Sequence, residues 1–469
     1  GTSGSLHAQE RWNLQRAVAH AVAQNISVRQ SDIQARLTAL QVKQTDAGRY
    51  PNIAFSTDAG YRLGRSINPA TNTFENQSIF FTQFGLQSGI TLFNWFSQRY
   101  ASEAARLDQK AAEAVSEKAR NDIALNVAVG YLQALLASEQ VEISRVQIGQ
   151  TAAQLETVRK QVRAGSLPEL NALELEAQLA RDSAAFISSE ATYRQNIILL
   201  KALLSLDMAV PFDIEKPAVD QIPVEPLAEL QPQAVYEQAL KNLPQQRVNQ
   251  YRFQSAQKNI QVARASMYPT LSGFASLNTS YSSLFPDQQR MIVTPTGKFD
   301  TTNLIVEVSP GNFRRALSPG VNVLAPNAGF GRQLFVISPG QAVGISLNVP
   351  ILQGRQLRSA WERARLQADN IRLQMDLDNL TLQQDIYSAY NDAVNALQRY
   401  RAAQKAVEAA ERAFSFSQRR YEVGLLQTIE LITNQNNLYR SRLDALAARY
   451  EYVFRMKLLE FYKGQGLKL

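Results

Sequence analysis

Ala47-Gly48-Arg49-Tyr50-Pro51 returns later in the chain as Ala265-Ser266-Met267-Tyr268-Pro269, 218 residues further on. Each segment ends a long stretch of helical periodicity and opens a stretch in which apolar and polar residues alternate. Further along, Val162-Arg163-Ala164-Gly165 matches Tyr421-Glu422-Val423-Gly424 at an offset of 259 residues. Two matched series in the same order predict an internal two-fold repeat.

The repeat divides the 469-residue chain into three parts. We predict a first repeat over residues 9–206, a proline-rich linker over 207–232 and a second repeat over 233–463. The two offsets differ by 41 residues, so the second repeat carries that much extra sequence between Pro269 and Pro350. The Gly- and Pro-rich stretch 285–341 accounts for it and is predicted to be an external loop. At the N-terminus, Ala8 either ends a signal-peptide cleavage site or belongs to a cloning remnant.

Alternating residues predict two strands in each repeat. The strands are expected at about residues 52–65 and 78–93, and at about 270–282 and 336–351. Ile53, Phe55, Tyr61 and Leu63 share one face of the first strand. Strands of this length with one apolar face are typical of membrane β-barrels, and a sheet on a soluble core is the alternative.

Two uninterrupted helical stretches, at about 97–164 and 355–423, contain no proline. At about 1.5 Å per residue each extends about 100 Å, too long for a globular domain. Gly165 and Gly424 follow them and suit the left-handed position after a helix. We therefore predict a sharp hairpin tip at each glycine, with a capping box from Ser166 to Glu169 opening the next helix.

Four strands in one chain leave two unpaired edges, which lipid does not tolerate. A membrane barrel needs at least about eight strands, so copies of the chain must associate. Three copies would supply twelve strands and bundle the long helices into a tube. The sequence predicts a mixed α/β membrane protein of this kind.

Composition argues against catalysis. The chain has no cysteine, and His7 and His20 are its only histidines. Few suitable side chains are therefore available for a catalytic triad, a metal site or a cofactor site. We expect no enzyme, no metal and no cofactor. The net charge of +8 comes from Lys and Arg dispersed among acidic residues. That pattern is typical of solvated helix faces, so no nucleic-acid partner is expected.

The Tyr-Pro junctions at Tyr50 and Tyr268 and the turns ending at Gly165 and Gly424-Leu425 resemble those of the TolC outer-membrane factor family. The resemblance spans about residues 10–463. It implies a homotrimer with a 12-stranded outer-membrane β-barrel, four strands per chain, continuous with a long periplasmic α-helical barrel. It also implies the outer membrane of a Gram-negative bacterium and contact with its lipid.

The resemblance assigns roles to the tips. Gly165, Ser166, Gly424 and Leu425 would dock a periplasmic adaptor protein that connects to an inner-membrane transporter.

The resemblance also implies a gate at the tunnel entrance. Glu430 and Thr433 match two ring-forming acidic positions, of which one keeps its charge. Tyr421 and Asn171 would hydrogen-bond in the closed tip, whereas Leu426 removes the charged part of the family's lock.

Aromatic residues mark the junctions between strands and helices. Tyr50, Phe93, Trp95 and Tyr268 fit a girdle at the membrane interface.

The function that follows is an outer-membrane exit duct of a tripartite export system, conducting drugs or other small molecules passively. A protein secretion duct of the same family and a soluble coiled-coil scaffold are the alternatives. The scaffold explains the helices but leaves the strands without a purpose.

Overall fold

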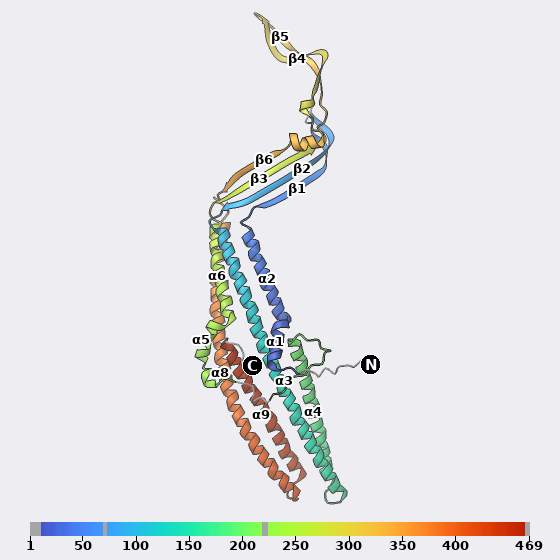
Figure 1. The fold of residues 1–469 in the computed structure, drawn as a ribbon, viewed down its shortest axis with the longest axis vertical. Coiled ribbons are helices and arrows are strands. Elements are labelled where there is room, and N and C mark those ends of the chain that lie inside the picture. The colour runs from blue at the N-terminus through green and yellow to red at the C-terminus, as the bar shows by residue number, and fades with distance from the viewer. Residues whose placement is uncertain (1–10, 69–72, 218–223, 465–469) are drawn as a thin grey trace, which may run out of the picture. The chain divides into compact units, whose positions relative to one another are not determined.

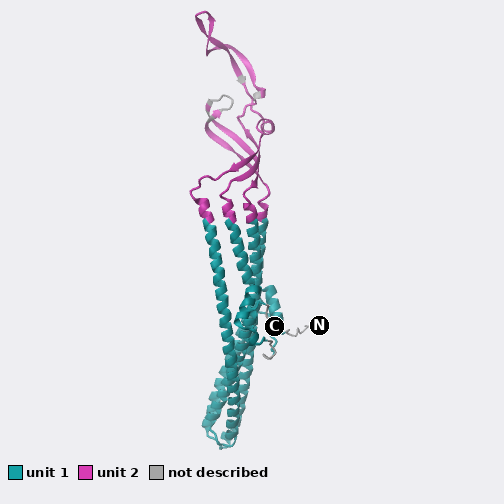
Figure 2. Cartoon of the chain, turned by 90° about the vertical axis from the view of Figure 1, so that its left-hand side faces the viewer, with its two compact units in different colours: residues 1–43, 101–260, 362–469 teal, residues 44–100, 261–361 magenta. Residues whose placement is uncertain are grey.

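The structure is a computed structural model that describes residues 11–68, 73–217 and 224–464. Residues 9 and 10 of the predicted first repeat and 218–223 of the predicted linker lie outside the described residues. Contacts divide the chain into two compact units (Figure 2). Unit 1 takes residues 1–43, 101–260 and 362–469, and unit 2 takes 44–100 and 261–361.

The elements are labelled in Figure 1. In chain order they are α1 (Leu14–Gln24), α2 (Ile26–Ala47), β1 (Asn52–Asn68), β2 (Thr73–Phe93), α3 (Ser97–Arg163), α4 (Glu169–Leu203), η2 (Leu227–Glu229), α5 (Pro232–Asn242), α6 (Pro244–Ala265), β3 (Thr270–Ser282), η3 (Gln288–Arg290), β4 (Ile292–Ser309), β5 (Asn312–Leu324), α7 (Phe330–Arg332), η4 (Gln333–Ile337), β6 (Gly340–Asn348), α8 (Gln356–Glu422) and α9 (Thr428–Tyr462).

The internal duplication is confirmed by the helices. α3 and α8 have 67 residues each, and α4 and α9 have 35 residues each. Their sequences lack proline in the interior and are rich in alanine, which favours long helices and close packing. No described helix is both long enough and apolar enough to cross a membrane.

The core of unit 1 lies where α1, α3, α4 and α9 meet. Tyr131, Leu135 and Leu200 are at most 1% exposed there. The described part of the linker packs onto this core, because Ile214 is fully buried and forms a parallel bridge with Trp12. The Tyr131 hydroxyl donates to the Glu215 carbonyl at 2.6 Å, which ties the linker to α3.

Unit 2 contains an antiparallel sheet in the order β1-β2-β3-β6, so the two repeats meet at the β2–β3 pair. The register aligns Phe55, Leu86 and Leu277 across three strands, and all three side chains are exposed. The opposite face carries small and polar residues such as Gln83 and Asn278. The alternation of the sequence therefore becomes one continuous apolar face.

Two strand predictions need correction. The last strand is shorter than residues 336–351, because Gln333–Ile337 form a π-helical turn and β6 covers only Gly340–Asn348. The predicted external loop contains a long β-hairpin, β4–β5, which pairs Ile292 with Leu324 at one end and Ser309 with Asn312 at the other. Bulges interrupt its register after Pro295, Thr301 and Glu307, so the sequence shows no sustained alternation there.

Candidate functional site at the helical hairpin tips

The two hairpin tips have the same hydrogen-bond pattern. Gly165 and Gly424 adopt φ values of +73° and +74°. After α3, the Gly165 N–H donates to the Val162 carbonyl and the Ser166 N–H to the Gln161 carbonyl, both at 3.0 Å. After α8, the corresponding pairs are Gly424 to Tyr421 at 3.0 Å and Leu425 to Arg420 at 2.8 Å. This is the Schellman motif, which needs a residue that tolerates the left-handed region.

The predicted capping box at Ser166 is wrong. The N-cap of α4 is Pro168, which makes no side-chain cap hydrogen bond. The Ser166 hydroxyl donates instead to the Gln161 carbonyl at 2.9 Å, so it completes the end of α3. Glu169 still supplies a carboxylate to the first turn of α4, where the helix dipole favours it.

A cavity of about 500 Å³ separates the two tips. Ser166 and Asn171 line it from the first tip, and Tyr421 and Gly424 line it from the second. The apolar cluster beside it contains Leu155, Val158, Ala172, Leu175 and Ile432, all buried. The structure thus brings together residues of both repeats that the sequence analysis assigned to docking and gating.

The predicted hydrogen bond between Tyr421 and Asn171 is replaced by another. The Tyr421 hydroxyl lies 3.1 Å from the hydroxyl of Thr428, the first residue of α9 and 2% exposed. This contact closes the second tip on itself. Asn171 is half-buried and faces the same cavity without bonding to Tyr421.

Glu430 and Thr433 lie on the exposed face of the first turns of α9. The Thr433 hydroxyl donates to the Ile429 carbonyl at 2.8 Å, and the Glu430 carboxylate has no ion-pair partner among the described residues. The 259-residue offset relates Glu430 to Asn171 and Thr433 to Glu174. Glu174 is half-buried on α4 and is a carboxylate at the position equivalent to Thr433. No local pattern marks Glu174 as a site residue, but the 259-residue offset does.

Large apolar side chains are exposed at both tips. Leu170, Val423 and Leu425 are 61%, 68% and 68% exposed. Exposed apolar side chains at a tip are more typical of a surface that binds another protein than of one that only faces water.

A buried polar network lies next to the tip cluster. The Asp182 carboxylate accepts from the Thr151 hydroxyl at 2.6 Å and from the Gln178 amide at 2.8 Å. The Gln435 amide of α9 donates to the Thr151 hydroxyl at 3.1 Å. These four residues are at most 5% exposed. No local sequence pattern links them, because they lie on three different helices.

Trp95 contacts two of the other three predicted interfacial aromatics in unit 2. The Trp95 ring lies 4.9 Å from that of Tyr268 and 5.5 Å from that of Phe93. Trp95 and Phe96 have positive φ values of 53° and 62°, which turns the chain sharply between β2 and α3. Tyr50 is 75% exposed and has no aromatic partner among the described residues.

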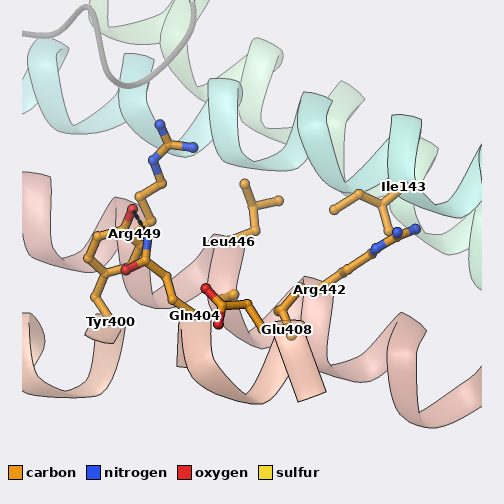
Figure 3. Close-up of a pocket in the computed structure, with 9 residues that line it drawn as sticks. Ile143, Tyr400, Gln404, Glu408, Arg442, Leu446 and Arg449 are labelled. Atoms are coloured by element: carbon orange, nitrogen blue, oxygen red, sulfur yellow. Dashed lines mark hydrogen bonds between the residues drawn. The ribbon is translucent and has the colours of Figure 1, made fainter. Parts of the chain in front are cut away.

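A second cavity, of about 360 Å³, lies between α3, α8 and α9 (Figure 3). Arg442, Arg449 and Glu408 line it, and the Gln404 amide donates to the Tyr400 hydroxyl at 2.8 Å. Arg442 is paired with Glu411 at 2.8 Å. Within the described ranges, no three His, Cys, Asp or Glu side chains lie together so that they could hold a metal ion, in this cavity or elsewhere.

The sequence matches a known protein family. Residues 17–205 and 316–463 match the model of a family described as outer membrane efflux protein. Among curated proteins the sequence has no match.

Three solved structures share the fold. The CmeC outer membrane channel of Campylobacter jejuni is 15% identical, with a TM-score of 0.74 over 97% of this chain and 86% of that one. VceC, an outer membrane protein of Vibrio cholerae, is 14% identical, with a TM-score of 0.70 over 97% of both chains. The MtrE outer membrane channel of Neisseria gonorrhoeae, in its open state, is 18% identical, with a TM-score of 0.71 over 97% and 89%.

Proposed function

This chain belongs to the outer membrane efflux protein family, and from that premise we propose that it is the exit duct of a tripartite export system. It conducts drugs or other small molecules passively from an inner-membrane transporter and a periplasmic adaptor to the outside of a Gram-negative cell. Three copies form the duct.

The exposed apolar face of the sheet is the observation that carries the proposal. Val343, Ile345 and Leu347 on the edge strand β6 are 86%, 69% and 65% exposed. Their partners across β3 include Ala275 and Leu271, so the face continues into the sheet. Water disfavours such a surface, whereas lipid covers it at no cost.

The outer edges of β1 and β6 support the trimer. Neither has a partner strand in the described sheet. In lipid, these edges must pair with other copies of the chain. Three four-stranded sheets then close a twelve-stranded barrel wide enough for a lumen.

The tip cavity and the exposed residues Leu170, Val423 and Leu425 support adaptor docking. A photo-crosslinking amino acid at Leu425 should capture a periplasmic adaptor protein in intact cells. The same amino acid at Leu366, which is 69% exposed on α8 but far from the tip in sequence, is the control. Equal capture at both positions would argue against docking through the tips.

Planar-bilayer conductance of the purified oligomer tests the duct itself. Three Glu430 carboxylates around the entrance should favour cations, so Glu430→Gln should reduce cation selectivity. Glu142→Gln, which removes an exposed α3 carboxylate with Arg145 beside it, is the matched control and should leave selectivity unchanged. Unchanged selectivity in Glu430→Gln would refute the acidic ring, and the absence of any conductance would refute the duct.

A further inference from the structure

The polar face of the β1-β2-β3-β6 sheet carries a cavity of about 450 Å³, called here the sheet cavity. Ser56 and Asp58 of β1, Gln83 of β2, and Asn278 and Ser280 of β3 line it. The register accounts for this grouping, because Asp58 pairs with Gln83 and Gln83 pairs with Ser280, so these side chains share one face. The sheet cavity therefore lies within unit 2, on the face opposite to the exposed apolar one.

Gly85 keeps the floor of the sheet cavity open. A Cβ at Gly85 would come within 3.2 Å of both the Asn278 Oδ1 atom and the Ser56 hydroxyl oxygen. These two polar atoms thus converge over a position that has no side chain. Glycine inside a strand often marks a place where a ligand approaches the backbone closely.

The polar side chains around the sheet cavity keep their hydrogen-bonding capacity. None of them forms a side-chain hydrogen bond or an ion pair with another described residue: Ser56, Asp58, Gln83, Asn278 and Ser280. Together they offer hydroxyl, amide and carboxylate oxygens to a molecule that enters. The wall of the cavity is therefore ready to accept N–H donors.

Asp58 gives the sheet cavity an unbalanced negative charge. In the part of the sheet around the cavity, only Asp58 and Arg62 are charged among residues 52–63, 77–93, 270–282 and 340–348. Four residues separate the two along β1, which is about 13 Å at about 3.3 Å per residue and too far for an ion pair. The Arg62 guanidinium lies instead 5.3 Å from the centre of the Phe81 ring, where a cation–π contact holds it.

A carboxylate among hydroxyl and amide oxygens suits a protonated amine, whose N–H groups donate to all of them. A divalent metal ion fits less well, because it takes about six or more oxygen ligands and the cavity offers a single carboxylate. One exposed ammonium–carboxylate pair changes affinity only about two- to fivefold. Such weak binding suits a solute that must also leave.

We propose that the sheet cavity is a transient binding site for the protonated amino groups of small organic solutes. Asp58 is the charged partner, and Ser56, Gln83 and Asn278 accept hydrogen bonds. The proposal rests on the proposed function, in which the apolar face contacts lipid and the polar face lines the duct. It adds a substrate class to that function, namely cationic amines.

Thiol modification tests the charge of the site in the full chain, which has no cysteine of its own. Ser280→Cys protein in a non-ionic detergent at low salt is treated with cationic 2-aminoethyl or anionic 2-sulfonatoethyl methanethiosulfonate. Adding Asp58→Asn should lower the ratio of the cationic to the anionic rate about two- to fivefold. Thr91→Cys is the control, because Thr91 lies on the same face but pairs with Ser272, far along the strands from Asp58. An unchanged ratio at Ser280→Cys would overturn the proposal.

Protection by putrescine, a diamine that is protonated at neutral pH, tests the ligand class. Putrescine should slow the reaction of Ser280→Cys with the neutral reagent methyl methanethiosulfonate. Asp58→Asn should weaken this protection about two- to fivefold, and Asp58→Glu should retain it. Fully N-methylated putrescine has the same charge without N–H donors, and Mg²⁺ has the same charge without an organic body. Equal protection by either of them would overturn the assignment to amines.

Planar-bilayer currents place the site in the conduction path. Putrescine should reduce the current, and Asp58→Asn should weaken this block, with Glu430→Gln present in every protein so that the tip entrance does not contribute. Arg62→Gln is the matched control, because it removes one charge from the same face of β1 and should not weaken the block. A current that putrescine leaves unchanged would overturn the proposal and keep the duct. Protection without any current would refute the duct and keep the amine site.

Discussion

Gln178 and Asn436 exchange two side-chain hydrogen bonds, at 2.9 and 3.2 Å, and so join α4 of the first repeat to α9 of the second. Gln178 is 3% exposed and also donates to Asp182. The amide pair therefore connects the two hairpins through a buried network. Packing of apolar side chains alone would hold the helices together with less specificity.

Replacement of Asn436 should reveal this connection. Asn436→Ala leaves the buried Gln178 amide short of partners, and we expect a loss of about 1–3 kcal/mol in the free energy of unfolding. Urea unfolding followed by circular dichroism measures it. Asn434→Ala is the control, because the Asn434 amide donates to the Glu430 carbonyl of its own helix. Equal losses in the two variants would contradict the role of the amide pair.

Thr151 is the second point of the network to test. Thr151→Val keeps the shape of the side chain but removes a donor to the buried Asp182 carboxylate, and should cost about 1–3 kcal/mol. Thr157→Val makes the same change on the same helix, where the exposed hydroxyl donates to the Ala153 carbonyl. The difference between the two variants measures the network, and a difference near zero would count against it.

The tip glycines should resist substitution for a conformational reason. A Cβ at Gly165 or Gly424 would meet no atom within 4 Å, so the cost of alanine comes from the positive φ alone. We expect about 1–2 kcal/mol for each. Gly149 has the same open surroundings inside α3 but a helical φ, and Gly149→Ala should stabilise by about 0.5–1 kcal/mol. Opposite signs in thermal unfolding are the expected result, and a stabilised Gly424→Ala would be inconsistent with the Schellman geometry.

Acid should weaken the contact between α2 and α3 at Asp32. The hydrogen bond from Ser116, with further help from Arg120, holds the pKa of Asp32 below its ordinary value of 3.8 against the effect of burial. A carboxylate with a lowered pKa stabilises the folded state above its unfolded pKa, and this stability is lost as pH falls through the folded pKa. Asp32→Asn should therefore lower the melting temperature at pH 7 and have less effect below about pH 4. A melting-temperature difference between the two proteins that does not change from pH 7 to pH 3 would be the contrary outcome.

The architecture could be predicted from the sequence because it depends on local and repeated signals. Tyr50-Pro51 and Gly165 mark the chain reversals, and each has a counterpart in the second repeat. Strand faces follow from alternation alone, and the pairing of Phe55 with Leu86 on one face agrees with it.

The details of the tip required the three-dimensional structure. A serine followed three residues later by glutamate has the pattern of a capping box, yet the Schellman turn takes both the N–H and the hydroxyl of Ser166 for the Gln161 carbonyl. The Tyr421 hydroxyl lies beside the Thr428 hydroxyl because the turn brings the start of α9 back to the end of α8. Asp182 and Gln435 are 253 residues apart, and no local pattern links them.

Equal helix lengths have a consequence for how this protein can vary. The buried layer of Thr151, Asp182 and Gln435 joins α3, α4 and α9, so these helices must keep their level relative to one another. A deletion of about seven residues in α3, between Thr151 and the tip, would bring Ser144 to this layer, since seven residues make about two turns. Ser144 already pairs with the Tyr439 hydroxyl at 2.9 Å, so the same deletion would break that contact too. Insertions or deletions can therefore be tolerated only when the helices of both hairpins change length together. Neither repeat can lengthen or shorten its helices alone.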